Sequence, residues 1–288
     1  MEDSAWQSSY QAAEQLIEWN RYKEALEETQ RLLALDPEDA DAMALAGRIY
    51  VLMDRHAEGL HWSAEALRRD PEHLLAWFVR VSAYYESGQL QAFQEALTEA
   101  LRLDPYESFY YYLNANYYNK KGQFPLAKSE LLRALEIQPH NAVYLALLSY
   151  VEALLGHFEE SARIDAQAIR IDAETPHVLL HLAWAARTRG DFKLDETYMK
   201  SAIRLNPDEK QFQDEYLEAL QLAHPLFRIF TVPGKYIRRM KPWQIWVAWI
   251  AAWILFKPLV LLFIVLYAVS KLGTKALVHV RVFGWRRR

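Results

Sequence analysis

Apolar and polar positions along residues 6–209 repeat every 34 residues, and a proline after a polar residue marks most of the steps. The marking pairs are Asp36-Pro37, Asp70-Pro71, Asp104-Pro105, Gln138-Pro139 and Asn206-Pro207. The missing step falls at Asp172-Ala173. Proline cannot continue a helix, and it pushes the preceding residue out of the helical region, so the chain is expected to turn at each pair. An internal repeat of this length predicts a stack of similar units.

Two further columns keep the same step when the units begin at Trp6, Ala40, Leu74, Ser108, Ala142 and Pro176. The fifteenth position holds glycine or a small polar residue, namely Asn20, Asp54, Gly88, Gly122, Gly156 and Gly190. Glycine there lets a first helix end in a left-handed residue. The twenty-seventh position holds Leu32, Ala66, Ala100, Ala134, Ala168 and Ala202, whose alanines allow close helix approach. Each unit is therefore predicted to be two antiparallel helices that need the next unit to bury their apolar faces.

The sequence thus predicts an all-α solenoid of about six helix-turn-helix repeats over residues 1–225. Residues 208–224 are expected to add one more helix, because Phe212, Tyr216, Leu217 and Leu220 recur at helical spacing before Pro225. This helix would cap the apolar end of the stack.

The pattern resembles the tetratricopeptide repeat family. The matching residues are Trp77 and Tyr111 at position 4, Gly47 and Ala115 at position 8, Tyr50, Tyr84 and Tyr118 at position 11, and Ala25 and Ala127 at position 20. The resemblance covers residues 6–209, with units 2 to 4 the most typical. It weakens at position 20 of two units, where Phe93 and Ser161 stand.

The resemblance implies that the first helix of each unit lines a concave groove that binds a partner. The residues at the corresponding positions are Tyr10, Arg48, Phe78, Ser82, Tyr85, Tyr112, Asn116, Asn119, Tyr150, Trp184 and Arg187. Aromatic rings interleaved with amide and guanidinium groups can hold an extended or helical peptide. Packing between neighbouring helices is the alternative role for any one of these rings. The lysine and asparagine pattern of the family's carboxylate-clamp subgroup is absent.

No enzyme activity, cofactor or metal site is predicted. The chain has no cysteine, which excludes thiol catalysis and cysteine-ligated zinc. Two histidines, His177 and His181, lie four residues apart on one predicted helix, but a metal site needs more ligands than two. No Gly-rich phosphate loop, nucleophile elbow or HExxH helix occurs.

Charge divides the chain near Pro225. Residues 1–225 hold 21 basic and all 37 acidic residues, a net charge of −16. Residues 226–288 hold 12 basic residues and no acidic one, a net charge of +12. A tail of this sign suggests contact with a polyanion, either nucleic acid or anionic lipid.

The apolar run from Trp243 to Ser270 favours lipid. Its only charge is Lys257, and 28 helical residues would measure about 42 Å, more than the roughly 30 Å of a bilayer core. We therefore predict a basic juxtamembrane linker (226–242), a membrane-inserted segment (243–270) and a basic C-terminal tail (271–288). The residues expected at the membrane surface are Arg228, Lys235, Arg238, Arg239, Lys241, Trp243 and Trp246.

The topology of this segment has three candidate solutions. A single tilted span kinked at Pro258 fits the length, but it exports the basic tail. A hairpin turning at Lys257-Pro258 keeps both basic flanks in the cytoplasm, but each arm of about 14 residues reaches only roughly 21 Å. Surface-lying amphipathic helices are the third. The single span is preferred, with the repeats facing the cytoplasm because no signal peptide precedes them.

These features predict a membrane-anchored scaffold or assembly factor that binds a protein or peptide partner in the groove. One alternative is a regulator whose groove binds a small peptide or metabolite and so changes contacts with a membrane partner. A less favoured alternative is an RNA-binding repeat protein, although no nucleic acid partner is expected. The partners predicted are thus a protein or peptide, the bilayer through residues 243–270, and anionic headgroups through the basic flanks.

Overall fold

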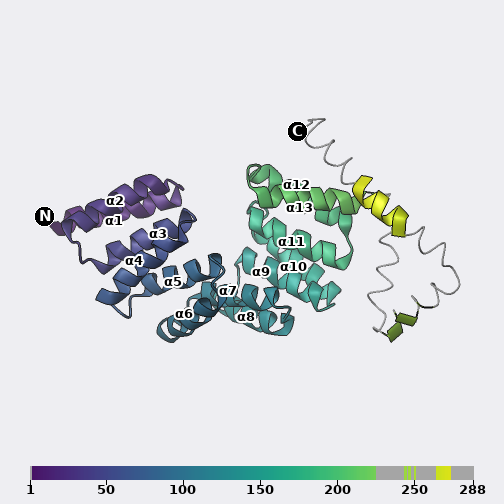
Figure 1. Ribbon diagram of the computed structural model, residues 1–288, viewed down its shortest axis with the longest axis horizontal. Coiled ribbons are helices and arrows are strands. Elements are labelled where there is room, and N and C mark those ends of the chain that lie inside the picture. The colour runs from purple at the N-terminus through teal and green to yellow at the C-terminus, as the bar shows by residue number, and fades with distance from the viewer. Residues whose placement is uncertain (1, 225–242, 245, 248–249, 251–263, 274–288) are drawn as a thin grey trace. The chain divides into compact units, whose positions relative to one another are not determined.

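The computed structural model describes residues 2–224, 243–244, 246–247, 250 and 264–273 (Figure 1). All regular structure in these residues is helical, as predicted. The chain divides into two compact units, Met1–Pro139 and His140–Arg288. The boundary lies inside the repeat ladder, at the Gln138-Pro139 step, so each unit is described on its own.

The first unit contains eight helices in the part of it that the structure describes. They are α1 (Glu2–Glu18), α2 (Tyr22–Leu35), α3 (Ala40–Leu52), α4 (His56–Arg69), α5 (Leu74–Glu86), α6 (Leu90–Leu103), α7 (Ser108–Lys120) and α8 (Phe124–Ile137). Each odd-numbered helix packs against the even-numbered helix that follows it, as in a helical hairpin (Figure 1).

The described residues of the second unit up to His224 form five further helices. They are α9 (Ala142–Leu154), α10 (Phe158–Ile171), α11 (Pro176–Arg189), α12 (Phe192–Leu205) and α13 (Lys210–Ala223). Here α9 packs on α10 and α11, and α12 packs on α11 and α13. Residues 264–273 are also helical.

The predicted 34-residue step is confirmed by the helix boundaries. The first helices of successive repeats, from α3 to α13, begin at residues 40, 74, 108, 142, 176 and 210. The second helices, from α2 to α12, begin at residues 22, 56, 90, 124, 158 and 192. The helix predicted at 208–224 is present as α13, whose Phe212 is fully buried against α11 and α12.

The fifteenth position is left-handed in all six repeats. The backbone angle φ is 58° at Asn20 and Asp54 and lies between 71° and 85° at Gly88, Gly122, Gly156 and Gly190. Asparagine and aspartate tolerate this region better than other side chains do, although less well than glycine. The turn between the two helices of a repeat is therefore kept even where glycine is absent.

Small residues allow the helices of a repeat to approach closely, as the sequence predicts. Ala66, Ala100, Ala134, Ala168 and Ala202 are all buried. The approach between α3 and α4 is also close, since a Cβ added to Gly59 would lie 2.6 Å from Cγ2 of Val51.

Two departures from the repeat pattern produce local packing of their own. Phe93 stands where Ala25 and Ala127 stand in other repeats, and it is fully buried between the rings of Tyr85 and Tyr117 at 5.3 and 5.8 Å. At the missing proline step, Asp172 keeps the turn because its side chain accepts hydrogen bonds from the backbone N–H groups of Glu174 (2.8 Å) and Thr175 (2.9 Å). Asp36, Asp70 and Asp104 make the same bond to the residue two positions on, so this Asx turn occurs with proline and holds the step where proline is absent.

A buried polar network occupies the second unit where Ser161 replaces alanine. Ser149 on α9 donates to the backbone carbonyl of Ser161 at 2.9 Å and contacts Asp165, while Arg189 on α11 is paired with the Asp165 carboxylate. Ser149, Ser161 and Asp165 are all buried. Because each buried polar group has a partner, the network ties α9, α10 and α11 together.

Candidate partner-binding face

The predicted groove residues of the first repeats are paired with other side chains. The ring of Tyr10 stacks on that of Trp6, with centroids 5.0 Å apart. Arg48 on α3 donates from Nη1 to both carboxylate oxygens of Glu14 on α1, each at 3.0 Å. Burial, followed by the charge of Glu14, raises the pKa of Tyr10. The Arg48 guanidinium therefore already has an anionic partner.

Three aromatic rings from α5 and α7 form a stack in the first unit. The ring of Phe109 lies 5.3 Å from that of Phe78 and 5.7 Å from that of Tyr112, with interplanar angles of 30° and 29°. All three side chains are half-buried. Two of these residues, Phe78 and Tyr112, were predicted groove residues, and the structure brings them together through Phe109, which the prediction omitted.

Other predicted groove residues of the first unit lie deeper. Ser82 is buried, and its hydroxyl donates to the backbone carbonyl of Phe78 at 2.8 Å. Tyr85 is also buried, where desolvation raises its pKa, and Lys120 Nζ lies 4.3 Å from its ring centroid. These two side chains contribute to packing in the first unit.

The two predicted asparagines lie near the end of α7. Asn116 is half-buried, and its Nδ2 donates to the backbone carbonyl of Tyr112 at 3.0 Å. Asn119 is half-buried, and its backbone carbonyl accepts the N–H of Gly122 at 3.0 Å. Along α7 the two asparagines follow Tyr112, a member of the ring stack, by about one and two helical turns.

In the second unit, Tyr150 on α9 and Trp184 on α11 form an aromatic pair. Their ring centroids are 5.5 Å apart, and both side chains are half-buried. Burial raises the pKa of Tyr150, while the nearby Arg187 opposes this shift and Glu215 adds to it. Tyr150 and Trp184 were each predicted as groove residues, and the structure places their rings in contact.

Arg187 on α11 is surrounded by three carboxylates. It lies 2.9 Å from Asp195 on α12, and 3.0 and 3.3 Å from Glu215 and Glu218 on α13. Asp195 is fully buried, and desolvation raises its pKa to about 6 against the opposing effect of Arg187. We call these four residues the Arg187 cluster. The cluster joins three helices and contains three carboxylates and one cation.

Sequence reasoning predicted Arg187 but missed the three acids. Asp195 occupies the twentieth position of its repeat, where Ala25 and Ala127 stand in others. This was the available signal: an acidic residue stands at a position that holds a small residue in other repeats and faces the buried side of the helix. A buried carboxylate needs a partner. Nothing in the local sequence pattern pointed to Glu215 and Glu218.

The two histidines of α11 have apolar and aromatic neighbours. His181 is buried, its ring lies 5.4 Å from that of Trp184, and burial lowers its pKa to about 3. The His177 ring lies 5.6 Å from that of Phe212. Within the described residues, no group of three histidines or carboxylates could hold a metal ion.

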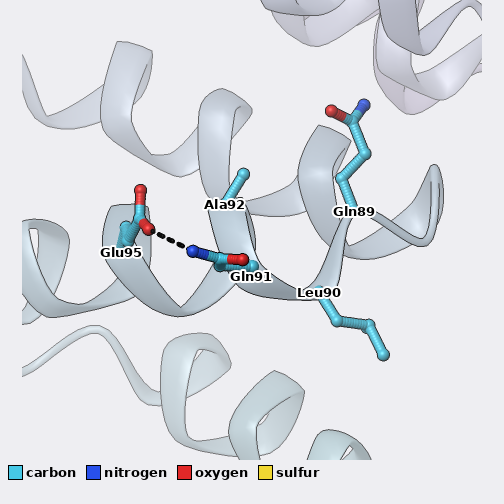
Figure 2. A pocket seen from close by; sticks show the side chains of 5 residues that line it. All are labelled: Gln89, Leu90, Gln91, Ala92 and Glu95. Carbon is cyan, nitrogen blue, oxygen red and sulfur yellow. Dashed lines mark hydrogen bonds between the residues drawn. The ribbon is translucent and has the colours of Figure 1, made fainter.

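A shallow depression lies at the start of α6 (Figure 2). It is lined by Gln89, Leu90, Gln91, Ala92 and Glu95, and Gln91 donates from Nε2 to Glu95 at 3.3 Å. Figure 2 shows the side chains of Gln89 and Leu90 pointing to opposite sides of the helix start. These side chains do not converge on a common point, so the depression is not a candidate site.

Most of the predicted membrane-surface residues, Arg228, Lys235, Arg238, Arg239 and Lys241, lie outside the described residues. So does most of the predicted membrane segment, including residues 251–263. The side chains of Trp243 and Trp246 are 62% and 72% exposed. In the described part of the chain, no helix has the length and apolar character needed to cross a membrane.

Comparison with solved structures identifies the fold. A chain of the APC/C hetero-tetramer Cut9–Hcn1 matches 75% of this chain with a TM-score of 0.65 at 15% identity, and this chain spans only 43% of it. PilF of Pseudomonas aeruginosa matches 75% of this chain and 98% of its own length, with a TM-score of 0.59 at 16% identity. PilW, described as a type IV pilus biogenesis factor, matches 73% of this chain and 97% of its own, with a TM-score of 0.56 at 19% identity. At these identities the likeness concerns the fold.

Sequence comparison gives a narrower match. No curated protein sequence matches this chain. Residues 57–108, which run from α4 to the start of α7, match the family model for the tetratricopeptide repeat. This segment is thus similar to the tetratricopeptide repeat family, and the described helices share the fold of the helical-repeat structures above.

Proposed function

We propose that this protein is a membrane-held scaffold that binds a segment of a partner protein through the first helices of its repeats. The observation that carries the proposal is the set of half-buried aromatic side chains on those helices. The rings of Phe78, Phe109 and Tyr112 lie in contact in the first unit, and those of Tyr150 and Trp184 in the second. Aromatic side chains at such positions supply large contact areas with few rotatable bonds, which favours binding.

Membrane attachment forms the second part of the proposal. It is supported by the apolar run of 243–270 and by basic flanks without any acid. Large apolar side chains in the described part of this run, such as Trp246, Val265 and Val269, are more than half exposed. A contiguous set of such side chains is unfavourable in water and suits a lipid environment. The repeats are proposed to face the cytoplasm.

The proposal is tested by crosslinking followed by a pull-down from native membranes. Wild type is compared with the triple variant Tyr112→Ala/Asn116→Ala/Trp184→Ala. The scaffold function predicts a defined set of partner proteins that the triple variant loses while its circular dichroism spectrum stays close to that of wild type. Retention of the full set by a folded triple variant would show that these helices are not the binding face.

A further inference from the structure

The second unit presents a surface on which aromatic rings and carboxylates lie together. Tyr150, Trp184 and Glu218 come from α9, α11 and α13, the first helices of three successive repeats. The Tyr150 and Trp184 rings are in contact. Trp184 and Arg187 stand three residues apart on α11, which puts both side chains on one face of that helix, so the ring pair lies beside the Arg187 cluster.

The only cation of this cluster is already held by anions. The Arg187 side chain is 18% exposed and lies within 3.3 Å of all three carboxylates. One guanidinium among three ionised carboxylates leaves a formal charge of −2. Arg187 therefore does not offer a free positive charge to a partner.

The Glu218 carboxylate of α13 retains capacity for a further donor. The Glu218 side chain is 55% exposed. Oε2 of Glu215 lies 3.0 Å from Arg187 but accepts no hydrogen bond among the described residues, and this atom is buried. This atom is closed to an outside partner, so the exposed Glu218 carboxylate is the group that can accept a further N–H donor.

Aromatic faces attract the same kind of group. A lysine or arginine side chain over a ring is held by the ring quadrupole, most strongly over tryptophan. This chain uses such contacts itself in its first unit, where the Arg80 guanidinium lies 5.4 Å from the Tyr84 ring centroid and Lys120 Nζ lies 4.3 Å from that of Tyr85. Rings and carboxylates on one surface together fit a basic side chain.

We propose that the surface formed by Tyr150, Trp184, Glu215 and Glu218 binds a lysine- or arginine-bearing segment of the partner protein. This inference rests on the proposed scaffold function and specifies the chemistry of its partner. The net charge of −16 over residues 1–225 has the sign that attracts such a segment over longer distances. The basic residues of the partner would approach α13, and an apolar neighbour would cover Trp184.

The test selects peptides from a random display library by their binding to the full-length protein in detergent. Only peptides whose binding is lost with Trp184→Ala are counted, because acidic peptides can bind the basic tail instead. The counted peptides are then measured against Glu215→Gln/Glu218→Gln. The matched control is Glu159→Gln/Glu174→Gln, which removes two exposed acids of the same unit.

The proposal expects the counted peptides to be enriched in lysine and arginine. Their affinity should fall by about tenfold in Glu215→Gln/Glu218→Gln and remain unchanged in the control variant. Their affinity for the wild type should also fall with added salt, because the screening length shortens from about 10 Å at 0.1 M to about 3 Å at 1 M. Enrichment of acidic or uncharged peptides, or binding that ignores the Glu215→Gln/Glu218→Gln change, overturns the inference and leaves the scaffold function standing.

Two other outcomes separate the inference from its premise. If no peptide depends on Trp184, this surface is not a binding face, and both the inference and the scaffold function lose their support in the second unit. If basic peptides bind only after Arg228, Lys235, Arg238, Arg239 and Lys241 are replaced by glutamine, the protein's own tail occupies the surface. That result overturns the assignment to an external partner.

Discussion

Arg187 on α11 donates from Nε to Oδ2 of Asp195 on α12 at 2.9 Å, and this bond joins two helices inside the second unit. Asp195 is fully buried there, and its pKa is raised to about 6. The folded protein therefore binds a proton at this carboxyl more tightly than the unfolded chain does, where an aspartate has its ordinary pKa of about 3.9. The Asp195 carboxyl therefore makes the free energy of unfolding depend on pH.

The first prediction concerns Asp195→Asn. Between pH 6 and about 4 the Asp195 carboxyl stabilises the folded state as pH falls, by about 1.4 kcal/mol per pH unit, because only the folded chain holds the proton. His181 acts in the opposite direction. Its folded pKa of about 3 means that only the unfolded chain binds a proton below pH 6.5. The two effects oppose each other in the wild type, so Asp195→Asn should lose stability more steeply on acidification.

Urea unfolding of the wild type, Asp195→Asn and His181→Leu from pH 7 to pH 4.5 measures both effects. His181→Leu is the matched variant, and it should gain stability relative to the wild type as pH falls. It should also gain about 1 kcal/mol at pH 7, since the buried Nδ1 of His181 has no hydrogen-bond partner in the described structure. Parallel pH profiles for all three proteins would show that neither group has a shifted pKa.

The second prediction concerns the left-handed position of the repeat. Asp54 has φ 58° where other repeats carry glycine, so Asp54→Gly should raise the free energy of unfolding by about 0.5–1 kcal/mol. Gly190→Ala should lower it by about 1 kcal/mol through backbone strain alone, because an added Cβ would meet no atom within 4 Å. Thermal unfolding measures both changes. A destabilised Asp54→Gly would show that the aspartate side chain contributes more than its backbone conformation costs.

The third prediction separates packing residues from binding residues. Ala134 is fully buried, so Ala134→Leu should destabilise the protein by about 1–3 kcal/mol through overpacking. The triple variant Tyr112→Ala/Asn116→Ala/Trp184→Ala removes half-buried side chains and should keep nearly all of its helical content. Circular dichroism with thermal unfolding compares the two. If the triple variant unfolds as readily as Ala134→Leu, its residues belong to the core and the binding assignment fails.

The fourth prediction is the topology of the tail, which the absence of native cysteine makes testable. A single span through 243–270 places residues 4 and 285 on opposite sides of the membrane. In intact cells Ser4→Cys should not react with an impermeant maleimide, whereas Trp285→Cys should react. Protection of Trp285→Cys in intact cells, with labelling after lysis, would favour the hairpin or a surface-lying tail.

Much of the fold follows from the sequence because its signals are local. Proline at each step, a left-handed residue at each turn and alanine at each close approach act within one repeat, so one repeat predicts the next. The turn at Asp172-Ala173 lacks the proline signal, but Asp172 forms the same Asx turn that Asp36, Asp70 and Asp104 form before proline. Phe93 likewise looked like a defect of the pattern, yet Tyr85 and Tyr117 pack around it.

The candidate site was only partly predictable, for a related reason. Positions on the first helices could be read from the repeat, and these gave Tyr150, Trp184 and Arg187. The partners of Arg187 come from α12 and α13, so the net charge of the surface depends on contacts between repeats. Sequence position alone therefore gave Arg187 without the carboxylates that surround it.

The central claim is that the first helices of the repeats hold a partner at the membrane, and a photo-crosslinker at Trp184 tests it most directly. A benzophenone amino acid is placed at Trp184 on α11 and, as the control, at the exposed Thr197 on α12. Irradiation of intact cells is followed by membrane isolation and an alkaline wash. The account predicts a discrete crosslinked product from position 184 that stays with the washed membranes and is absent from position 197. Equal products from both positions, or recovery of the full-length protein in the wash, would contradict it.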